Sequence, residues 1–335
     1  MAPKLAGCKG ARRPGNSLTA VGAAAASLLA LSWSLTTPIT SAAAQTPAAT
    51  ETLSLVGFGA DPTGHTDSSA ALQKWYAAVV ASGVPGHLPH GTYRADSSIT
   101  WDLDRARRSG LKIYGDGPQQ SIIVIRSGTL SIICSCNAGA FYGEFADFGV
   151  RASYASGPAL RIGQENFKDA LNSFYFRNLV INNLSPAPTA AALELNEVLG
   201  SHFVNIIANV AGHGDALRVR QTQFSTIQGA FGTSDDAVHI TGGYSYGNTF
   251  LNLDMEVTAY DLVIDSVNAG SNTFIGGAWV WRTAAINATA GESNLILNPT
   301  FGSGPITQAL GASTVGIEVQ SSRYPVPGRL GPRSH

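Results

Sequence analysis

The chain has 335 residues, of which 13% are charged and 37 are glycine. Charged residues make up about a quarter of an average soluble protein, so this composition is typical of a turn-rich β protein and disfavours a helical bundle. With 21 basic and 22 acidic residues, the chain lacks the excess positive charge of proteins that bind nucleic acid or anionic membranes.

Residues 1–44 are typical of a cleavable secretory signal. They contain four basic residues and no acidic one, then an apolar run from about Leu18 to Trp33, then the small residues Ser41-Ala42-Ala43-Ala44. The run is Ala-rich and short for a membrane span, which disfavours a membrane anchor. Cleavage after Ala44 leaves 17 basic and 22 acidic residues, a net charge of −5. The sequence therefore predicts a secreted or periplasmic protein with no nucleic-acid or membrane partner.

Residues 45–51 form a predicted linker to a domain at residues 52–322, and this domain begins with an amphipathic helix. Asp67 or Ser68 can cap the helix at its N-terminus, and Gly83 can end it in a left-handed conformation. Its apolar residues fall on one stripe: Leu72, Trp75, Tyr76, Val79 and Val80. We expect this helix to cap the N-terminal end of the domain.

Short strands and turns follow the helix, and their order resembles a known family. The series GFGADPTGHTD, helix, HLPHGTYR, LKIYGDG is similar to the N-terminal signature of the pectate-lyase superfamily, which is also found in phage tailspikes and several glycoside hydrolases. The resemblance covers Leu55 to Ile125, within a predicted N-terminal cap at about residues 52–125. It implies a right-handed parallel β-helix and a carbohydrate setting, but it does not name a reaction.

A repeated four-residue motif supports the solenoid independently. The tetrads ALRI, ALEL, ALRV and AVHI recur, and DLVI, AINA and GIEV continue the series more loosely. Their second residues are Leu160, Leu193, Leu217, Val238, Leu262, Ile286 and Ile317, and most intervals are 21 to 24 residues. One coil of a parallel β-helix needs about this many residues, whereas a β-sandwich needs no aligned repeat of this length. The predicted fold class is thus all-β, a single-stranded parallel β-helix with an N-terminal capping helix, and the resemblance implies that it is right-handed.

The third residue of each tetrad belongs to a row on the outer surface. Side chains alternate between the two faces of a strand, so apolar second and fourth residues point into the core and the third points out. The row reads Arg161, Glu194, Arg218, His239, Val263, Asn287 and Glu318. Its first four members are ionisable, and they predict either an exposed salt-bridge ladder or the charged subsites of a polysaccharide groove.

Carboxylates cluster where two neighbouring tetrads begin. Asp215 and Asp236 each lie two positions before a second tetrad residue, so they share a register on adjacent coils, with Asp235 beside them and His213 just upstream. Glycoside hydrolysis needs such a group, in which one carboxyl is kept protonated by its neighbours' charge while another activates water or attacks the sugar. The alternative is turn chemistry, because Asp is common in turns between strands.

These residues also resemble the catalytic motif of polygalacturonase-like β-helix hydrolases. That motif has one Asp on one coil, an Asp pair on the next and a Gly-His-Gly further on, parts that the resemblance gives to Asp215, Asp235-Asp236 and Gly212-His213-Gly214. In this chain the Gly-His-Gly precedes the Asp pair. The predicted catalytic residues are Asp215, Asp235, Asp236 and His239. The predicted substrate contacts are Arg161, Glu194, His213, Arg218, Arg220, Trp279 and Trp281.

Elimination is the alternative reaction. Polysaccharide lyases abstract the proton beside a uronate carboxylate with an Arg or Lys base, while Ca²⁺ or a basic side chain neutralises that carboxylate. Arg218, Arg220 and His239 would suit that chemistry as well. The sequence has no metal-site spacing, so no metal or cofactor is predicted unless the protein is a lyase that requires Ca²⁺. A glycan-binding or adhesion module and a purely structural surface protein are two further alternatives.

Three residue pairs have mainly structural interpretations. Cys134 and Cys136 lie on one face of a strand, where two buried thiols are favoured over a mutual disulfide. Trp279 and Trp281 alternate onto one face and either pack in the core or stack on sugar rings. The last pair, found in GNTF and SNTF at matching coil positions, predicts an asparagine ladder and consists of Asn248 and Asn272.

The sequence as a whole predicts an exported polysaccharide-active protein. We expect it to cleave an extracellular polysaccharide, with uronate-containing polymers among the candidates, by hydrolysis or β-elimination. Residues 323–335 are rich in Pro, Gly and Arg and predict a loose C-terminal tail. The chain is expected to be a monomer or a side-by-side homotrimer.

Overall fold

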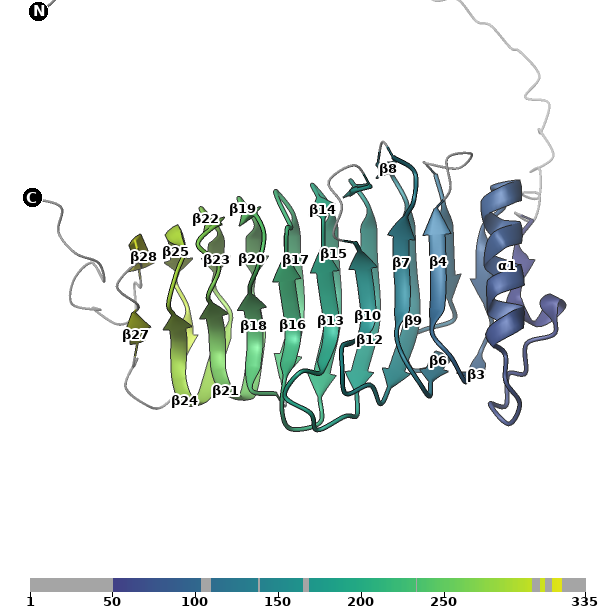
Figure 1. Cartoon of the computed structure of the whole chain (residues 1–335), viewed down its shortest axis with the longest axis horizontal. Coiled ribbons are helices and arrows are strands. Elements are labelled where there is room, and N and C mark those ends of the chain that lie inside the picture. The colour runs from purple at the N-terminus through teal and green to yellow at the C-terminus, as the bar shows by residue number, and fades with distance from the viewer. Residues whose placement is uncertain are drawn as a thin grey trace, which may run out of the picture. The chain divides into compact units, whose positions relative to one another are not determined.

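The computed structural model describes residues 51–103, 110–137, 139–164, 169–232, 234–302, 308–310 and 315–320. These residues form a parallel β-solenoid of about eight turns with few helices (Figure 1). Each strand pairs in parallel with the equivalent strand of the next coil. The parallel solenoid predicted from the tetrad repeat is therefore confirmed, while its right-handed sense stays a prediction.

Each coil presents three strand faces. The first face contains β2 (Gly86–Leu88), β5 (Lys112–Gly115), β20 (Thr249–Leu251), β23 (Thr273–Ile275) and β25 (Glu292–Leu297). The second face contains β3 (Gly91–Ala95), β6 (Ser121–Ile125) and β26 (Thr300–Phe301). Four strands bend across the first and second faces, namely β9 (Glu144–Ala152), β12 (Tyr175–Asn183), β15 (His202–Val210) and β17 (Thr226–Gly232).

The third face carries the tetrads. It contains β4 (Ile99–Leu103), β7 (Leu130–Cys134), β10 (Pro158–Gly163), β13 (Ala191–Asn196), β16 (Asp215–Arg220), β18 (Asp236–Ile240) and β27 (Gln308–Leu310). Two long strands join the second face to the third, β21 (Asp254–Ile264) and β24 (Ala278–Ala288). Short strands precede the next first face: β8 (Ala140–Phe141), β11 (Leu171–Asn172), β14 (Val198–Leu199), β19 (Ser245–Tyr246) and β22 (Ala269–Gly270). At the two ends, β1 (Leu53–Ser54) pairs with β2, and β28 (Val315–Gln320) pairs with β25.

The strand register on the third face matches the predicted alignment for six of the seven tetrads. Their second residues pair in sequence from coil to coil and are buried. The prediction for the last tetrad is wrong, because Ile317 pairs with Asn294, whereas Ile286 pairs with Gln308 of β27. The long final interval hid this additional strand, so Glu318 lies outside the row of third residues.

The predicted helix is present as α1 (Ser69–Ser82), which follows a short 3₁₀ helix, η1 (Leu55–Phe58). The Asp67 carboxylate accepts a hydrogen bond from the Ser69 amide (2.9 Å), and Gly83 ends the helix with a φ of 73°. The whole predicted apolar stripe is buried. Figure 1 shows α1 at the N-terminal end of the solenoid, where it contacts β4. Its role as a cap stays a prediction.

Packing beneath α1 gives a first test of the fold. A Cβ atom on Gly86 would lie 2.6 Å from a Trp75 ring atom and 2.8 Å from a Val79 methyl group. Both neighbours are fully buried, so Gly86→Ala is expected to lower the free energy of unfolding by about 1–3 kcal/mol. Gly57→Ala is the matched control, since nothing lies within 4 Å of the added Cβ. Equal urea midpoints for the two variants would contradict this packing.

Buried asparagines form the predicted ladder. Asn248 Nδ2 donates to Asn272 Oδ1 (2.9 Å), and Asn272 Nδ2 donates in turn to Asn294 Oδ1 (3.0 Å). Asn248 Oδ1 accepts a hydrogen bond from the Ser225 amide (3.1 Å), which links the ladder to the preceding coil. The prediction for Asn248 and Asn272 is confirmed, and the structure extends it by one coil.

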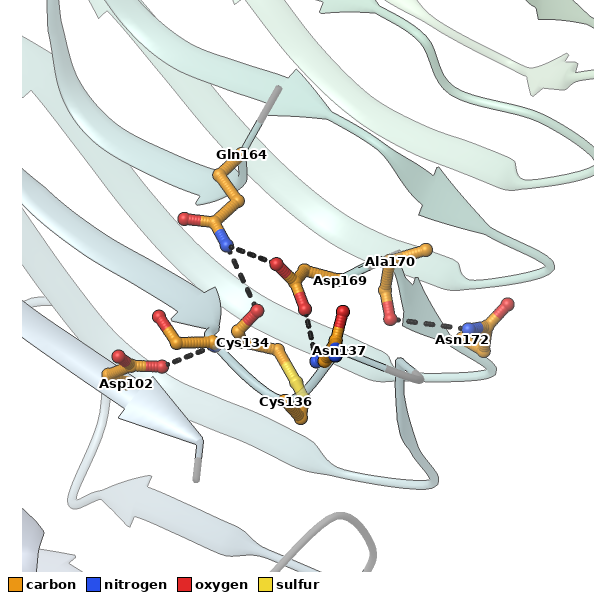
Figure 2. Close-up of a disulfide and its surroundings, with 9 residues drawn as sticks. Asp102, Cys134, Cys136, Asn137, Gln164, Asp169, Ala170 and Asn172 are labelled. Carbon is orange, nitrogen blue, oxygen red and sulfur yellow. Dashed lines mark hydrogen bonds between the residues drawn. A yellow bond between two sulfur atoms is a disulfide. The ribbon is translucent and has the colours of Figure 1, made fainter. Parts of the chain in front are cut away.

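The prediction of two buried thiols is wrong, because Cys134 and Cys136 form a disulfide (Figure 2). Their Cα atoms are 5.2 Å apart, within the usual range for a disulfide. The turn that follows β7 brings both sulfur atoms to one side. In Figure 2, Asp102 accepts a hydrogen bond from the Ser135 amide (2.7 Å), and Gln164 donates to the Cys134 carbonyl (3.0 Å).

The predicted signal at residues 1–44, nearly all of the linker and the tail at residues 323–335 lie outside the described residues. In the part of the chain that the structure describes, no helix combines the length and apolar character needed to cross a membrane.

Candidate active site

The two in-register aspartates open neighbouring strands on the third face. Asp215 is the first residue of β16, Asp236 is the first of β18, and the two pair in the sheet. The Gly214 carbonyl accepts hydrogen bonds from the Asp235 amide (3.0 Å) and the Asp236 amide (3.2 Å). Gly214 has a φ of 97°, and a Cβ there would overlap the Ala190 carbonyl oxygen. A glycine turn therefore sets the Asp pair beside the preceding coil.

The Asp215 carboxylate is the centre of a side-chain network. It is 4% exposed. One of its oxygens accepts a hydrogen bond from Arg218 Nε (2.5 Å), and the other lies 3.2 Å from His239 Nδ1. Asp236 Oδ2 lies 3.7 Å from the same His239 nitrogen, and the other ring nitrogen lies 3.2 Å from Asp265 Oδ2. His239 thus joins carboxyl groups from three successive coils.

Burial and neighbouring charges change the protonation of this network. Burial, together with the negative charge of Asp215, raises the pKa of Asp236 to about 7. Burial alone would lower the pKa of His239, but the hydrogen bond and charge of Asp215, with Asp265 and Asp236, raise it to about 9. Near neutral pH the site therefore holds a protonated imidazolium and a carboxyl group poised to donate or accept a proton.

A second carboxylate stands at the solvent side of the pair. Asp235 is partly exposed and lies 3.0 Å from His213 Nδ1. Its negative charge is one of the causes that raise the pKa of Asp236. The predicted group of Asp215, Asp235 and Asp236 is therefore brought together, and His213 contacts it. The site contains a carboxylate open to solvent beside a partly buried carboxyl of raised pKa.

The outward row is an ion-pair ladder. Arg161 Nε lies 2.8 Å from Glu194 Oε1, and Arg218 Nη1 lies 3.5 Å from Glu194 Oε2. Glu194 is only 2% exposed, so it has no surface to offer a substrate. The guanidinium groups of Arg161 and Arg218 both form ion pairs with carboxylates of this protein. These interactions favour the salt-bridge interpretation for the first three members of the row.

Three other predicted contacts do not reach the carboxyl group. Arg220 ends β16, at the opposite end of the strand from Asp215. Trp279 is 1% exposed, because it pairs with Met255 and Phe301 in an inward row, so it cannot stack on a sugar. Trp281 is partly buried against Phe301, with ring centroids 5.7 Å apart. The core interpretation of the two tryptophans is the one the structure supports.

Sequence reasoning missed two residues near the site. Asp265 pairs with His239, and it lies two positions beyond the third tetrad residue, on the same outward face. Arg282 Nη2 donates to the Ser234 carbonyl (3.1 Å), immediately before the Asp pair. Arg282 is 48 residues away in sequence, and no local pattern indicates this contact.

A further acid, Asp261, lies on β21, the strand that pairs with the strand of Asp236. Asp261 is completely buried, and its Oδ1 accepts a hydrogen bond from the Thr258 hydroxyl (2.6 Å). The strand register places it between Ala237 and Ala285 of the adjacent coils. It occupies the first position of its tetrad, which is alanine in five of the other tetrads. Asp261 therefore cannot join the surface carboxyl group.

Three side chains of this network could in principle act as ligands for a metal ion. Asp215, Asp236 and His239 each offer one ligand atom, and these atoms lie within 4.8 Å of one another. At neutral pH a cation there would have to displace the proton of His239, whose pKa is raised to about 9. Arg218 already neutralises Asp215, so the arrangement is satisfied by ion pairs within the chain.

Comparisons with known proteins agree on the fold. Residues 53–294 match the family model described as rhamnogalacturonase A/epimerase, pectate lyase-like. The chain is similar to the solved structure of Geobacillus virus E2 ORF18, with 15% identity, 81% of this chain and 61% of that chain covered, and a TM-score of 0.53. It is similar also to the Acinetobacter phage vb_AbaP_AS12 gp42 tailspike, with 12% identity, 77% and 46% covered, and a TM-score of 0.51.

These similarities have clear bounds. The chain spans 61% and 46% of the lengths of the two viral proteins, and identities this low indicate a shared fold alone. The DFA-IIIase of Arthrobacter chlorophenolicus A6 aligns with 79% of this chain and 93% of its own at 11% identity, with a TM-score of 0.43. A search of curated protein sequences found no match.

Proposed function

Because the chain belongs to the rhamnogalacturonase A/epimerase, pectate lyase-like family, we propose that it is an exported hydrolase of an extracellular polysaccharide. The observation that carries this proposal is Asp236, a partly buried carboxyl whose pKa is raised to about 7 beside two further carboxylates. Glycoside hydrolysis requires one carboxyl that is protonated at the working pH and a second that is ionised. The Asp group of the third face supplies both.

Each member of the group has a distinct role in the proposal. Asp236 is the general acid that protonates the leaving oxygen of the glycosidic bond. Asp235, which is open to solvent and held by His213, is the carboxylate that activates water or attacks the sugar. Asp215 and His239 are positioning residues, because they contact Asp236 and set its charge environment.

The network favours hydrolysis over elimination. Elimination would need an arginine or lysine base that is free to reach the substrate. Arg218 is bound by Asp215 and Glu194, so it is not free to take a proton from a substrate. Arg282, at the Ser234 carbonyl, is the cation we assign to a substrate carboxylate, which makes uronate-containing glycans the first candidates.

Three structural inferences accompany this function. The solenoid is right-handed, α1 closes its N-terminal end, and residues 1–44 direct export. Mass spectrometry of the exported protein tests the last inference directly, since cleavage after Ala44 gives an N-terminus at Gln45. An intact Met1 in the exported protein would refute it.

The reaction is tested by incubating the protein with polygalacturonate, rhamnogalacturonan and neutral polysaccharides. Release of reducing ends without the ultraviolet absorbance of unsaturated products is expected. Reducing ends accompanied by that absorbance would indicate elimination, and this result would contradict the proposal that the protein is a hydrolase. Retained binding to a polysaccharide with no new reducing ends means a binding module and would overturn it as well.

The pH profile of cleavage gives a further prediction. Since Asp236 must be protonated, kcat/KM is expected to fall above about pH 7, close to tenfold per pH unit. The charge of His239 lowers the pKa of Asp236, so His239→Gln is expected to move this limb to higher pH. A limb that stays in place, or that moves to lower pH, would exclude Asp236 as the acid. Arg161→Gln, on the same row but three coils away, is the control for loss of a surface charge.

A further inference from the structure

Exposed aromatic rings follow one edge of the solenoid, between the third face and the first. The short strands β8, β14, β19 and β22 mark this edge, which is the upper one in Figure 1. Four of the rings are exposed: Tyr142 (67%), Tyr175 (40%), Phe224 (62%) and Tyr246 (37%). His202 is exposed as well. We call these five residues the aromatic track.

The track contains one ring in each of five consecutive coils. Tyr142 precedes β9, Tyr175 begins β12, His202 begins β15, Phe224 precedes β17, and Tyr246 ends β19. Neighbouring coils are about 4.8 Å apart, so the five rings extend over about 19 Å along the solenoid axis. Two pairs touch directly, Tyr175 with His202 at 6.0 Å and Phe224 with Tyr246 at 5.1 Å between ring centroids.

Two of these rings occupy unfavourable backbone positions. Tyr142 has a φ of 58° and Phe224 a φ of 53°, in the left-handed region that bulky residues avoid. The hydrogen-bond ladder of this corner aligns them with small residues of the other coils: Ser173, Gly200, Gly247 and Ser271. The turn itself therefore calls for Ser or Gly. An exposed aromatic ring adds nothing to the core, so its presence at two strained positions indicates a function outside the fold.

We propose that the aromatic track binds a polysaccharide chain that lies parallel to the solenoid axis. Sugar rings stack their apolar faces on exposed aromatic side chains, and the coil repeat is close to the length of one sugar unit in an extended chain. Asn172, Ser173 and Gly200 occupy the corner positions of the two coils between those of Tyr142 and Phe224, so the exposed rings are interrupted there. A protein partner would be expected to need a continuous apolar patch, so this pattern favours a glycan.

The track is separate from the candidate active site. Phe224 and Tyr246 lie beyond the C-terminal ends of β16 and β18, whereas Asp215 and Asp236 open those strands. The track thus provides a holding surface on the same coils that carry the carboxyl group. This inference rests on the proposed function for the identity of the ligand, but it does not depend on cleavage.

The test is affinity electrophoresis in native gels that contain polygalacturonate, rhamnogalacturonan or arabinoxylan, with the full chain carrying Asp236→Asn so that the polymer stays intact. We expect at least one polymer to retard the protein. Tyr142→Ser and Phe224→Ser install the residue that neighbouring coils have, and each is expected to weaken retardation about tenfold with no loss in thermal stability. Leu184→Ser, which removes an equally exposed apolar side chain away from the edge, is expected to bind normally.

Three outcomes would contradict the proposal that the aromatic track binds a polysaccharide. They are retardation by none of the polymers, unchanged retardation of the Tyr142→Ser/Phe224→Ser double variant, and self-association of the parent protein that Phe224→Ser abolishes in sedimentation. The last would make the edge an interface between copies. Failure of the hydrolase is distinguishable, since track-dependent retardation can occur while the protein with Asp236 intact releases no reducing ends.

Discussion

Replacing Asp236 by asparagine is expected to lower the rate of polysaccharide cleavage by about 10²- to 10⁴-fold. The amide has nearly the shape of the carboxyl group but cannot transfer a proton to the leaving oxygen. It also removes the repulsion between Asp215 and Asp236 that contributes to the raised pKa of Asp236. The loss should therefore appear in kcat, measured as reducing ends released, while the urea midpoint is unchanged or higher.

Asp254→Asn is the control for this substitution. Asp254 is an exposed carboxylate that opens β21 on the second face, away from the Asp group. We expect that variant to cleave at the parent rate. Activity of Asp236→Asn within about threefold of the parent would remove Asp236 from the mechanism. A loss of activity accompanied by a lower urea midpoint would instead indicate a structural role for the carboxyl group.

Replacing Asp261 by alanine is expected to stabilise the protein above pH 7. Burial raises the pKa of Asp261 to about 7, against 3.8 for an ordinary Asp, and its Oδ2 has no hydrogen-bond partner among the described residues. A difference of this size corresponds to a penalty on the order of 4 kcal/mol once the group is ionised. Ala237 and Ala285 flank this position, so alanine fits the coil.

The effect should depend on pH in a defined direction. The folded state binds the Asp261 proton more tightly than the unfolded state, so the parent loses stability as pH rises from about 4 to about 7. The difference in unfolding free energy between Asp261→Ala and the parent should accordingly be small near pH 4 and reach its full value above pH 7. Urea unfolding across this range measures it. Destabilisation of the variant at pH 8 would mean that the carboxylate has a partner or a role that its burial conceals.

The repeat was predictable because solenoid geometry is local and periodic. Leu193, Leu217 and Val238 recur at the length of one coil, and an apolar residue at the same point of each coil must share one inward row. Prediction failed at Ile317, where an interval of 31 residues contained one more strand than the spacing suggested. It failed also at Cys134 and Cys136, because strand alternation does not say where a strand ends and turns.

The site was predictable only in part. Register alone placed Asp215 beside Asp236, since both stand at the same distance from an inward residue. The same rule left both a core role and a sugar-stacking role open for Trp279, because burial depends on how each turn is folded around the strand. Exposed partners that come from distant coils, such as Arg282, carry no signal in the local sequence.

The sequence by itself determined the parallel solenoid, its N-terminal helix, the buried asparagine ladder and the adjacency of two aspartates, because each follows from a period or a cap that involves a few neighbouring residues. Only the tertiary structure decided which carboxyl groups are charged and which surface is open. Those properties depend on burial and on the summed fields of side chains from several coils, as at Asp236, where Asp215, Asp235 and His239 act together.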